Sequence, residues 1–214
     1  MAEPGGLVLH GEPGWGSAIV EAQLAFYGLP FRFEATGDLF DSAEARERLR
    51  PLNPLAQVPV LVLPDGAVMT ESAAITLHLA DLTGRDDLVP GPQAAERAAF
   101  LRWLVFLVAN VYPTFTYADD PARFVKADES VRTAFRAEVD AYARQLWGHV
   151  EAAAVGPWFL GQRFSALDVY LAVMTKWRPR REWFAAHAPR LLAAADAAAA
   201  LPTVAPVMAR NFGG

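Results

Sequence analysis

The feature that most constrains the fold is a change of hydrophobic pattern near residue 90 of this 214-residue chain. Before that point, short apolar runs that suit strands alternate with helical runs, in the order β-α-β-α-β-β-α. Beyond it, the long periodic runs are all helical. Strands interleaved with helices predict a small α/β domain, whereas helices alone predict a helical one. We therefore expect an α/β domain over residues 1–84, a linker over 85–92 and an all-α domain over 93–214.

Local signals set the elements of the first part. Strands are expected over residues 7–10, 31–34, 60–63 and 67–69, and helices over 17–27, 41–49 and from 70 onward. Asp65-Gly66 is a hairpin signal between the last two strands. Ser17 is expected to be the N-cap of the first helix, which Gly28 and Pro30 end.

The second part is expected to hold helices at about 93–117, 128–153 and 165–177, followed by shorter ones. Pro113 is expected to bend or end the first of them, because proline lacks the backbone donor and its ring clashes with the preceding turn. Ser165 and Asp168 have the spacing of a capping box, in which each side chain bonds the backbone of the other. We interpret that pair as structural and not catalytic.

Composition excludes several classes of protein. Nineteen basic and 24 acidic side chains give a net charge of −5, which argues against binding to nucleic acid. No uncharged stretch approaches the ~20 residues that cross a bilayer. Residues 1–6 lack the basic and apolar parts of a secretory leader, so we expect a soluble, cytoplasmic protein without a membrane partner. The absence of cysteine and the scattered placement of four histidines predict no disulfide, no catalytic thiol and no metal site.

Three separated motifs resemble those of the cytosolic glutathione transferase family. Residues 52–61 contain the pattern N-P-x-x-x-V-P-x-L, which begins at Asn53, residues 71–75 match E-S-x-A-I, and residues 159–169 contain the S-x-x-D capping motif of the family's helical domain. The resemblance covers essentially the whole chain. It implies an α/β plus all-α fold, in which a thioredoxin-like βαβαββα domain precedes an all-helical domain.

The resemblance also implies a glutathione site. In the family the bond before the motif's proline is cis, so Val58–Pro59 is expected to be cis, with the Val58 N–H and C=O paired to the cysteinyl unit of glutathione. Gln57 belongs to the same segment. Ser72, at the positive end of a helix, is expected to hold the γ-glutamyl carboxylate, and Glu71 the α-ammonium.

A purely structural interpretation stays open for both segments. Val58–Pro59 is then a tight turn between a helix and an interior strand. Thr70 then caps the following helix, and Glu71 only offsets its dipole.

The sequence departs from the family where the thiol should be activated. The usual catalytic serine falls on Gly14 and the usual cysteine on Gly16. We expect Ser17 to take the catalytic role, because an N-cap oxygen accepts from the helix and leaves its proton free to point at a thiolate. A plain N-cap is the alternative. His10 is more often a core or rim residue than a base.

An electrophile pocket is expected between the two domains. Trp15 from the first domain, with Trp103, Phe106 and Asn110 from the first helix of the second, would line it. An aromatic stripe at helical spacing is more often plain core. Arg178, Arg180 and Arg181 form a basic group that we interpret as solvated or inter-subunit surface in preference to a substrate site.

The sequence therefore predicts a glutathione S-transferase of the detoxification type. Glutathione is the co-substrate, no metal is needed, and the bound thiolate attacks a small hydrophobic electrophile. The rival prediction is a carrier or scaffold that keeps the fold without turnover, which the two glycines Gly14 and Gly16 favour. The resemblance further implies a homodimer.

Overall fold

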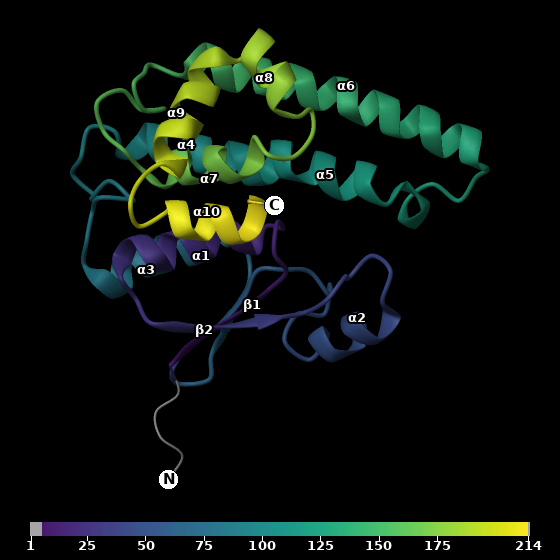
Figure 1. Ribbon diagram of the computed structural model, residues 1–214, viewed down its shortest axis with the longest axis horizontal. Helices are drawn as coiled ribbons and strands as arrows, with labels where there is room; N and C mark the ends of the chain where they lie inside the picture. Colours follow the sequence, from purple (N-terminus) through teal and green to yellow (C-terminus); the bar gives the residue numbers. More distant parts are fainter. Residues whose placement is uncertain (1–5, 214) are drawn as a thin grey trace. The chain divides into compact units, whose positions relative to one another are not determined.

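The computed structural model describes residues 6–213 and divides into two compact units (Figure 1). The first unit contains residues up to Val89 together with the segment from Ala198 onward, and the second contains Pro90–Ala197. The predicted division near residue 90 is present. The predicted second domain, however, ran to residue 214, whereas the chain rejoins the first unit at Ala198. Residues 1–5, on which the leader prediction depends, lie outside the described part.

The first unit is built on a mixed sheet with strand order β2-β1-β3-β4. Its elements are β1 (Leu7–Gly11), α1 (Ser17–Tyr27), β2 (Phe31–Ala35), α2 (Ala43–Leu49), β3 (Val60–Val62), β4 (Val68–Met69) and α3 (Ser72–Thr83). β1 pairs with β2 in parallel and with β3 in antiparallel fashion, and β3 pairs with β4 in antiparallel fashion. The predicted βαβαββα order is confirmed.

Helix α1 is buried on nearly every side. It contacts β1, α3 and the C-terminal helix α10 (Ala205–Phe212), which lies along it in Figure 1. Because the helix is enclosed in this way, most of its positions between Ser17 and Leu24 are apolar, and Glu21 and Gln23 are buried polar exceptions. The predicted N-cap was wrong: Gly16 holds that position, with no side-chain cap, and Ser17 is the first helical residue. Gly28 ends the helix in the left-handed conformation, with φ +69°.

The second unit is helical throughout its described regular structure, apart from one isolated bridge. Its helices are α4 (Arg97–Phe106), a π-helical turn (Leu107–Val111), α5 (Tyr112–Asp119), a 3-10 turn (Pro121–Arg123), α6 (Glu129–Ala153), α7 (Ala166–Met174), α8 (Arg181–His187) and most of α9 (Pro189–Ala199). Pro113 does not end the first long helix, as one alternative had it. The helix runs on to Asp119, and the wider π turn directly before Pro113 accommodates the backbone irregularity.

Helix α7 is the core helix of the second unit, and all of its residues are buried. The predicted capping box of Ser165 and Asp168 is present at its start. The Asp168 carboxylate accepts the Ser165 N–H at 2.9 Å and the Phe159 N–H at 2.7 Å, so it also fixes the preceding loop. Burial raises the pKa of Asp168 to about 6.

One continuous helix, Arg97–Asp119, is long and apolar enough to cross a membrane when judged by length and composition alone. Core helices of soluble proteins meet the same criterion, so the length and composition of this helix are weak evidence for a membrane span. Of the apolar window in this helix, 39% is buried inside the protein.

Candidate functional site

Three loops of the first unit meet at one end of its sheet. The register pairs His10 at the end of β1 with Val60 at the start of β3, and Leu61 of β3 with Met69 of β4. Because antiparallel neighbours run in opposite directions, the segment after β1, the segment before β3 and the segment after β4 all leave the sheet at this end. The sequence-predicted glutathione residues lie in the last two of these segments.

Val58 presents unpaired backbone groups at this end. The Val58–Pro59 peptide bond is cis, as the resemblance implied. Neither the Val58 N–H nor its C=O bonds another residue of 6–213, so both are available to an extended peptide.

Asn53 supports this loop and was not assigned a role from the sequence. It is 6% exposed, and its Nδ2 donates to the Gln57 carbonyl at 2.8 Å while its Oδ1 accepts the Leu55 N–H at 3.1 Å. The asparagine of the N-P-x-x-x-V-P pattern was the available signal.

Glu71 and Ser72 open helix α3. Glu71 is exposed and has φ +64°, a left-handed conformation that is uncommon for a residue with a side chain. Ser72 is the first helical residue and is almost fully buried. The first N–H groups of a helix have no partner within it, so this end suits a carboxylate. Glu71, not Thr70, is the N-cap, and its side chain makes no capping bond, so the alternative in which Thr70 caps the helix was wrong.

The hydroxyl of Ser17 is committed to the backbone of Glu12. Its Oγ donates to the Glu12 carbonyl at 3.0 Å and accepts the Glu12 N–H at 3.1 Å, and the residue is fully buried. The catalytic role of Ser17 stays a prediction, but its premise of a free hydroxyl proton was wrong. The N–H groups of Gly16 and Ser17 have no acceptor among the described residues, and they are the remaining donors at the start of α1.

The loop between β1 and α1 is held by a residue from the other end of the chain. Asn211 of α10 accepts the Gly14 N–H on its Oδ1 at 2.9 Å. Gly14 has φ +80°, and a Cβ there would lie 3.3 Å from the Asn211 carbonyl oxygen. Glycine at the usual serine position therefore serves both a left-handed turn and a close helix contact. Sequence reasoning missed Asn211, because no local pattern connects it to Gly14.

Asn211 is itself anchored by a buried carboxylate on α1. Its Nδ2 donates to Glu21 Oε2 at 2.9 Å and to the Val207 carbonyl at 2.9 Å, and Arg210 forms an ion pair with the same Glu21. The Glu21 side chain is 1% exposed. Burying a carboxylate costs free energy unless it is paired and hydrogen-bonded, and here both partners, Arg210 and Asn211, come from α10.

His10 and Trp15 lie in the same unit. The Nδ1 of His10 lies 4.0 Å from the Oε2 of Glu34 on the adjacent strand. Burial, together with the nearby charge of Arg32, lowers the pKa of His10. Trp15 packs against the core that α2 covers, with its ring 4.7 Å from that of Phe40. Its role in contacting substrate stays a prediction.

The predicted pocket residues of the second unit form part of its packing. Trp103 is 8% exposed and meets Phe106 and Phe159 edge to face, at 5.1 and 5.5 Å between ring centres. Asn110 lies in the π turn and donates to the carbonyl of Phe106 at 3.3 Å. Trp103 is thus a core residue, and the electrophile pocket stays a prediction. Among residues 6–213 no cluster of three or more His, Asp or Glu side chains could hold a metal.

Comparison with known proteins agrees with this architecture. The family model for the N-terminal domain of glutathione S-transferases matches residues 17–82. The chain is 41% identical to an uncharacterized GST-like protein of Escherichia coli K12, YncG, over 95% of this chain and 97% of the relative.

Solved structures of glutathione transferases share the fold, among them the following two. A glutathione transferase homologue from Sulfitobacter, determined with bound glutathione, has a TM-score of 0.83 at 24% identity, and the match covers 94% of this chain and 96% of the other. A sphingomonad glutathione S-transferase complexed with glutathione has a TM-score of 0.74 at 27% identity, with the same coverage. The chain belongs to the glutathione S-transferase family.

Proposed function

We propose that this protein binds glutathione at the end of the first unit's sheet and uses it as co-substrate in a transferase reaction. The observation that carries the proposal is the unpaired backbone of Val58 at the same sheet end as the open N-terminus of α3. Val58 pairs with the cysteinyl unit, flanked by Gln57 and Pro59. A solved relative that is 27% identical contains glutathione, which supports this assignment.

Recognition of the γ-glutamyl end falls to α3. The hydroxyl and N–H of Ser72 take the carboxylate, and the exposed carboxylate of Glu71 takes the ammonium. Ser72 is almost fully buried and Glu71 is exposed, so the two contacts hold the γ-glutamyl end from two sides and fix its orientation.

The thiol then faces the start of α1. A free thiol has a pKa of about 8.5, so most of it is protonated at neutral pH. The unpaired N–H groups of Gly16 and Ser17, with the positive end of the helix dipole, stabilise the thiolate that attacks the electrophile. Proximity supplies further rate, because the nucleophile and the electrophile are held together.

Calorimetry with glutathione tests the binding site. Glu71→Gln removes the charge that holds the ammonium, and Asp65→Asn is a matched control because it removes one charge from the neighbouring hairpin and keeps the acceptor for the Ala67 N–H. We expect Glu71→Gln to weaken glutathione binding by about two- to fivefold and Asp65→Asn to leave it unchanged. No heat of binding with wild-type protein at millimolar glutathione contradicts the proposal.

Turnover distinguishes the transferase from the carrier. Glycines at the usual serine and cysteine positions are the observation that favours a carrier. Conjugation of glutathione to an activated aryl halide supports the transferase. Glutathione binding without turnover on a broad panel of electrophiles supports the carrier instead.

A further inference from the structure

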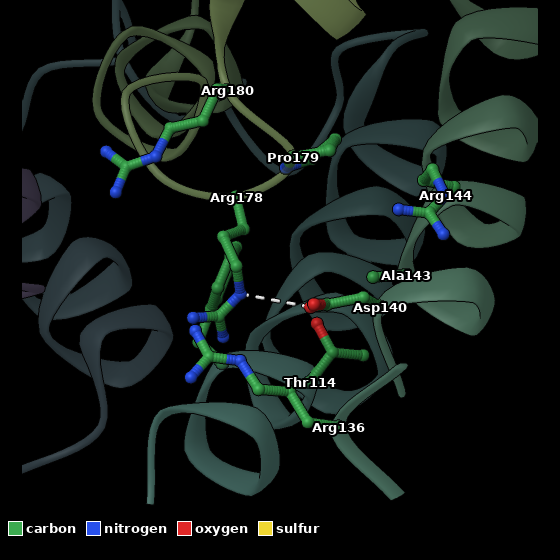
Figure 2. A pocket seen from close by; sticks show the side chains of 9 residues that line it. Thr114, Arg136, Asp140, Ala143, Arg144, Arg178, Pro179 and Arg180 are labelled. Carbon is green, nitrogen blue, oxygen red and sulfur yellow. Dashed lines mark hydrogen bonds and ion pairs between the residues drawn. The ribbon is translucent and has the colours of Figure 1, made fainter. Parts of the chain in front are cut away.

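A second candidate site lies entirely within the helical unit. A cavity of about 350 Å³ opens there (Figure 2), lined by Thr114, Phe115, Arg136, Asp140, Ala143, Arg144, Arg178, Pro179 and Arg180. None of these residues belongs to the proposed glutathione site. Four of the nine are arginines and one is acidic, in a chain whose net charge is −5. This concentration of positive charge requires an explanation.

Arg178 is fixed at the wall of the cavity. Its Nη1 donates to Asp119 at 2.5 Å and its Nε to Asp140 at 3.0 Å, the bond drawn in Figure 2. Its Nη2 is buried and has no hydrogen-bond partner in the described part of the chain. Two carboxylates therefore fix the orientation of this guanidinium at the cavity wall, and one of its nitrogens keeps an unused donor.

Arg136 and Arg144 lie one turn before and one turn after Asp140 on α6. At this spacing each could pair with Asp140 along the helix. Asp140 instead pairs with Arg178, and neither Arg136 nor Arg144 makes a hydrogen bond or ion pair with any residue of 6–213. In Figure 2 the guanidinium of Arg136 extends to the same side as that of Arg178. Two cations are therefore left at the cavity without an acceptor.

Arg180 adds a fourth guanidinium from an unusual backbone position. It has φ +78°, which is disfavoured for a residue with a side chain, and the conformation holds it directly after Pro179 at the cavity. Its Nη1 makes one hydrogen bond, to the Lys176 carbonyl at 3.3 Å. Most of its donors are free for a ligand.

Apart from Thr114, whose hydroxyl donates to the Val111 carbonyl at 2.6 Å, the remaining lining is apolar. Phe115, Pro179 and Ala143 supply carbon surface, and Phe115 is held by an edge-to-face contact with Trp177 at 5.1 Å. The volume falls within the ~300–1,000 Å³ of small-molecule sites. A tetrahedral dianion presents acceptors in several directions, which suits guanidinium groups that come from two different segments.

We propose that this cavity binds a small organic molecule that carries a phosphate or phosphonate dianion. The arginines hold the dianion, with Arg178 as the fixed donor and Arg136 and Arg144 as the adjustable ones. The organic part packs against Phe115 and Pro179. The cavity shares no lining residue with the proposed glutathione site, so the proposal is that the protein holds both ligands at once.

Calorimetry with phenylphosphonate, in the presence of saturating glutathione, tests the proposal on the full chain. Arg136→Gln/Arg144→Gln removes two charges from the cavity. Arg102→Gln/Arg123→Gln removes two charges from exposed positions of the same unit that do not line it, and so controls for net charge. We expect the first pair to weaken binding by about tenfold or more and the control pair to weaken it less than about twofold. Arg136→Lys/Arg144→Lys keeps the two charges but loses the paired donors of the guanidinium groups, so its affinity for phenylphosphonate is expected to lie between those of the two glutamine variants.

Three results would overturn the proposal. They are no binding of phenylphosphonate at millimolar concentration, equal binding by the two glutamine variants, and binding of inorganic phosphate as tight as that of phenylphosphonate. Circular dichroism of each variant confirms that it is folded. Benzoate, with one charge on a similar ring, is expected to bind more weakly than phenylphosphonate.

Discussion

Asn211 is predicted to fix the loop that precedes α1, and Asn211→Ala tests this. The substitution removes an acceptor from the Gly14 N–H and a donor from the buried Glu21 carboxylate. A hydrogen bond between neutral groups contributes about 1 kcal/mol, and one to a charged group about 1.5–3 kcal/mol. Arg210 still forms its ion pair with Glu21 in the variant, so we take the lower part of the range of about 1.5–3 kcal/mol for the lost hydrogen bond to the Glu21 carboxylate. The expected loss is about 3 kcal/mol in the free energy of unfolding of the first unit.

Two measurements check this prediction. Urea unfolding gives the stability, followed by the ¹⁹F signal of fluorotryptophan at Trp15, the first unit's tryptophan. Hydrogen exchange of the Gly14 amide reports the loop itself and is expected to accelerate in Asn211→Ala. Arg210→Gln is the control, because it weakens the hold on Glu21 and keeps the bond to Gly14. A stability change under about 0.5 kcal/mol, or unchanged exchange at Gly14, would refute the reasoning.

Three further predictions concern single side chains. Ser17→Ala should lower the melting temperature and leave the apparent thiol pKa of bound glutathione unchanged, because the hydroxyl proton is already donated to Glu12; a raised thiol pKa would restore the catalytic role of Ser17. The pKa of His10 in the folded protein lies below its ordinary value of 6.5. The contribution of His10 to folding stability is therefore fully present above pH 6.5 and is lost as the pH falls through the folded-state pKa. Urea titrations at several pH values should show this loss in wild type and not in His10→Gln. The pKa of Asp168 is about 6 in the folded protein against an ordinary 3.8. Its contribution to the free energy of unfolding is therefore full below pH 3.8 and declines as the pH rises through 6, by about 3 kcal/mol in all. Urea titrations of wild type and Asp168→Asn should differ by this pH dependence, and parallel curves of stability against pH would contradict it.

The order of elements in the first unit was predictable because each element carries its own local signal. Alternating apolar residues mark the strands, and Asp65-Gly66 marks the hairpin. The capping box at Ser165 and Asp168 was predictable for the same reason, since both partners lie within one turn. Local chemistry decides these features, and the sequence contains all of it.

The features that were missed depend on distant partners. Glu21 in the middle of a helix is typical of a solvated residue, and only α10 shows that it is buried and paired. The attachment of residues 198–214 to the first unit has the same cause. Ser17 was predicted to be an N-cap from its residue type, but the preceding loop places Glu12 where it takes both hydrogen bonds of the hydroxyl. The π turn before Pro113 has no local sequence signal.

The return of the chain to its first unit has a consequence for biosynthesis. A ribosome makes β1 through α3 first, but the helix that neutralises Glu21 and holds Gly14 is translated only after the whole helical unit. The nascent first unit therefore carries an unpaired carboxylate beside its core until α10 has been made. Premature termination before Ala198 would leave a protein with every proposed glutathione contact present and the loop before α1 untethered.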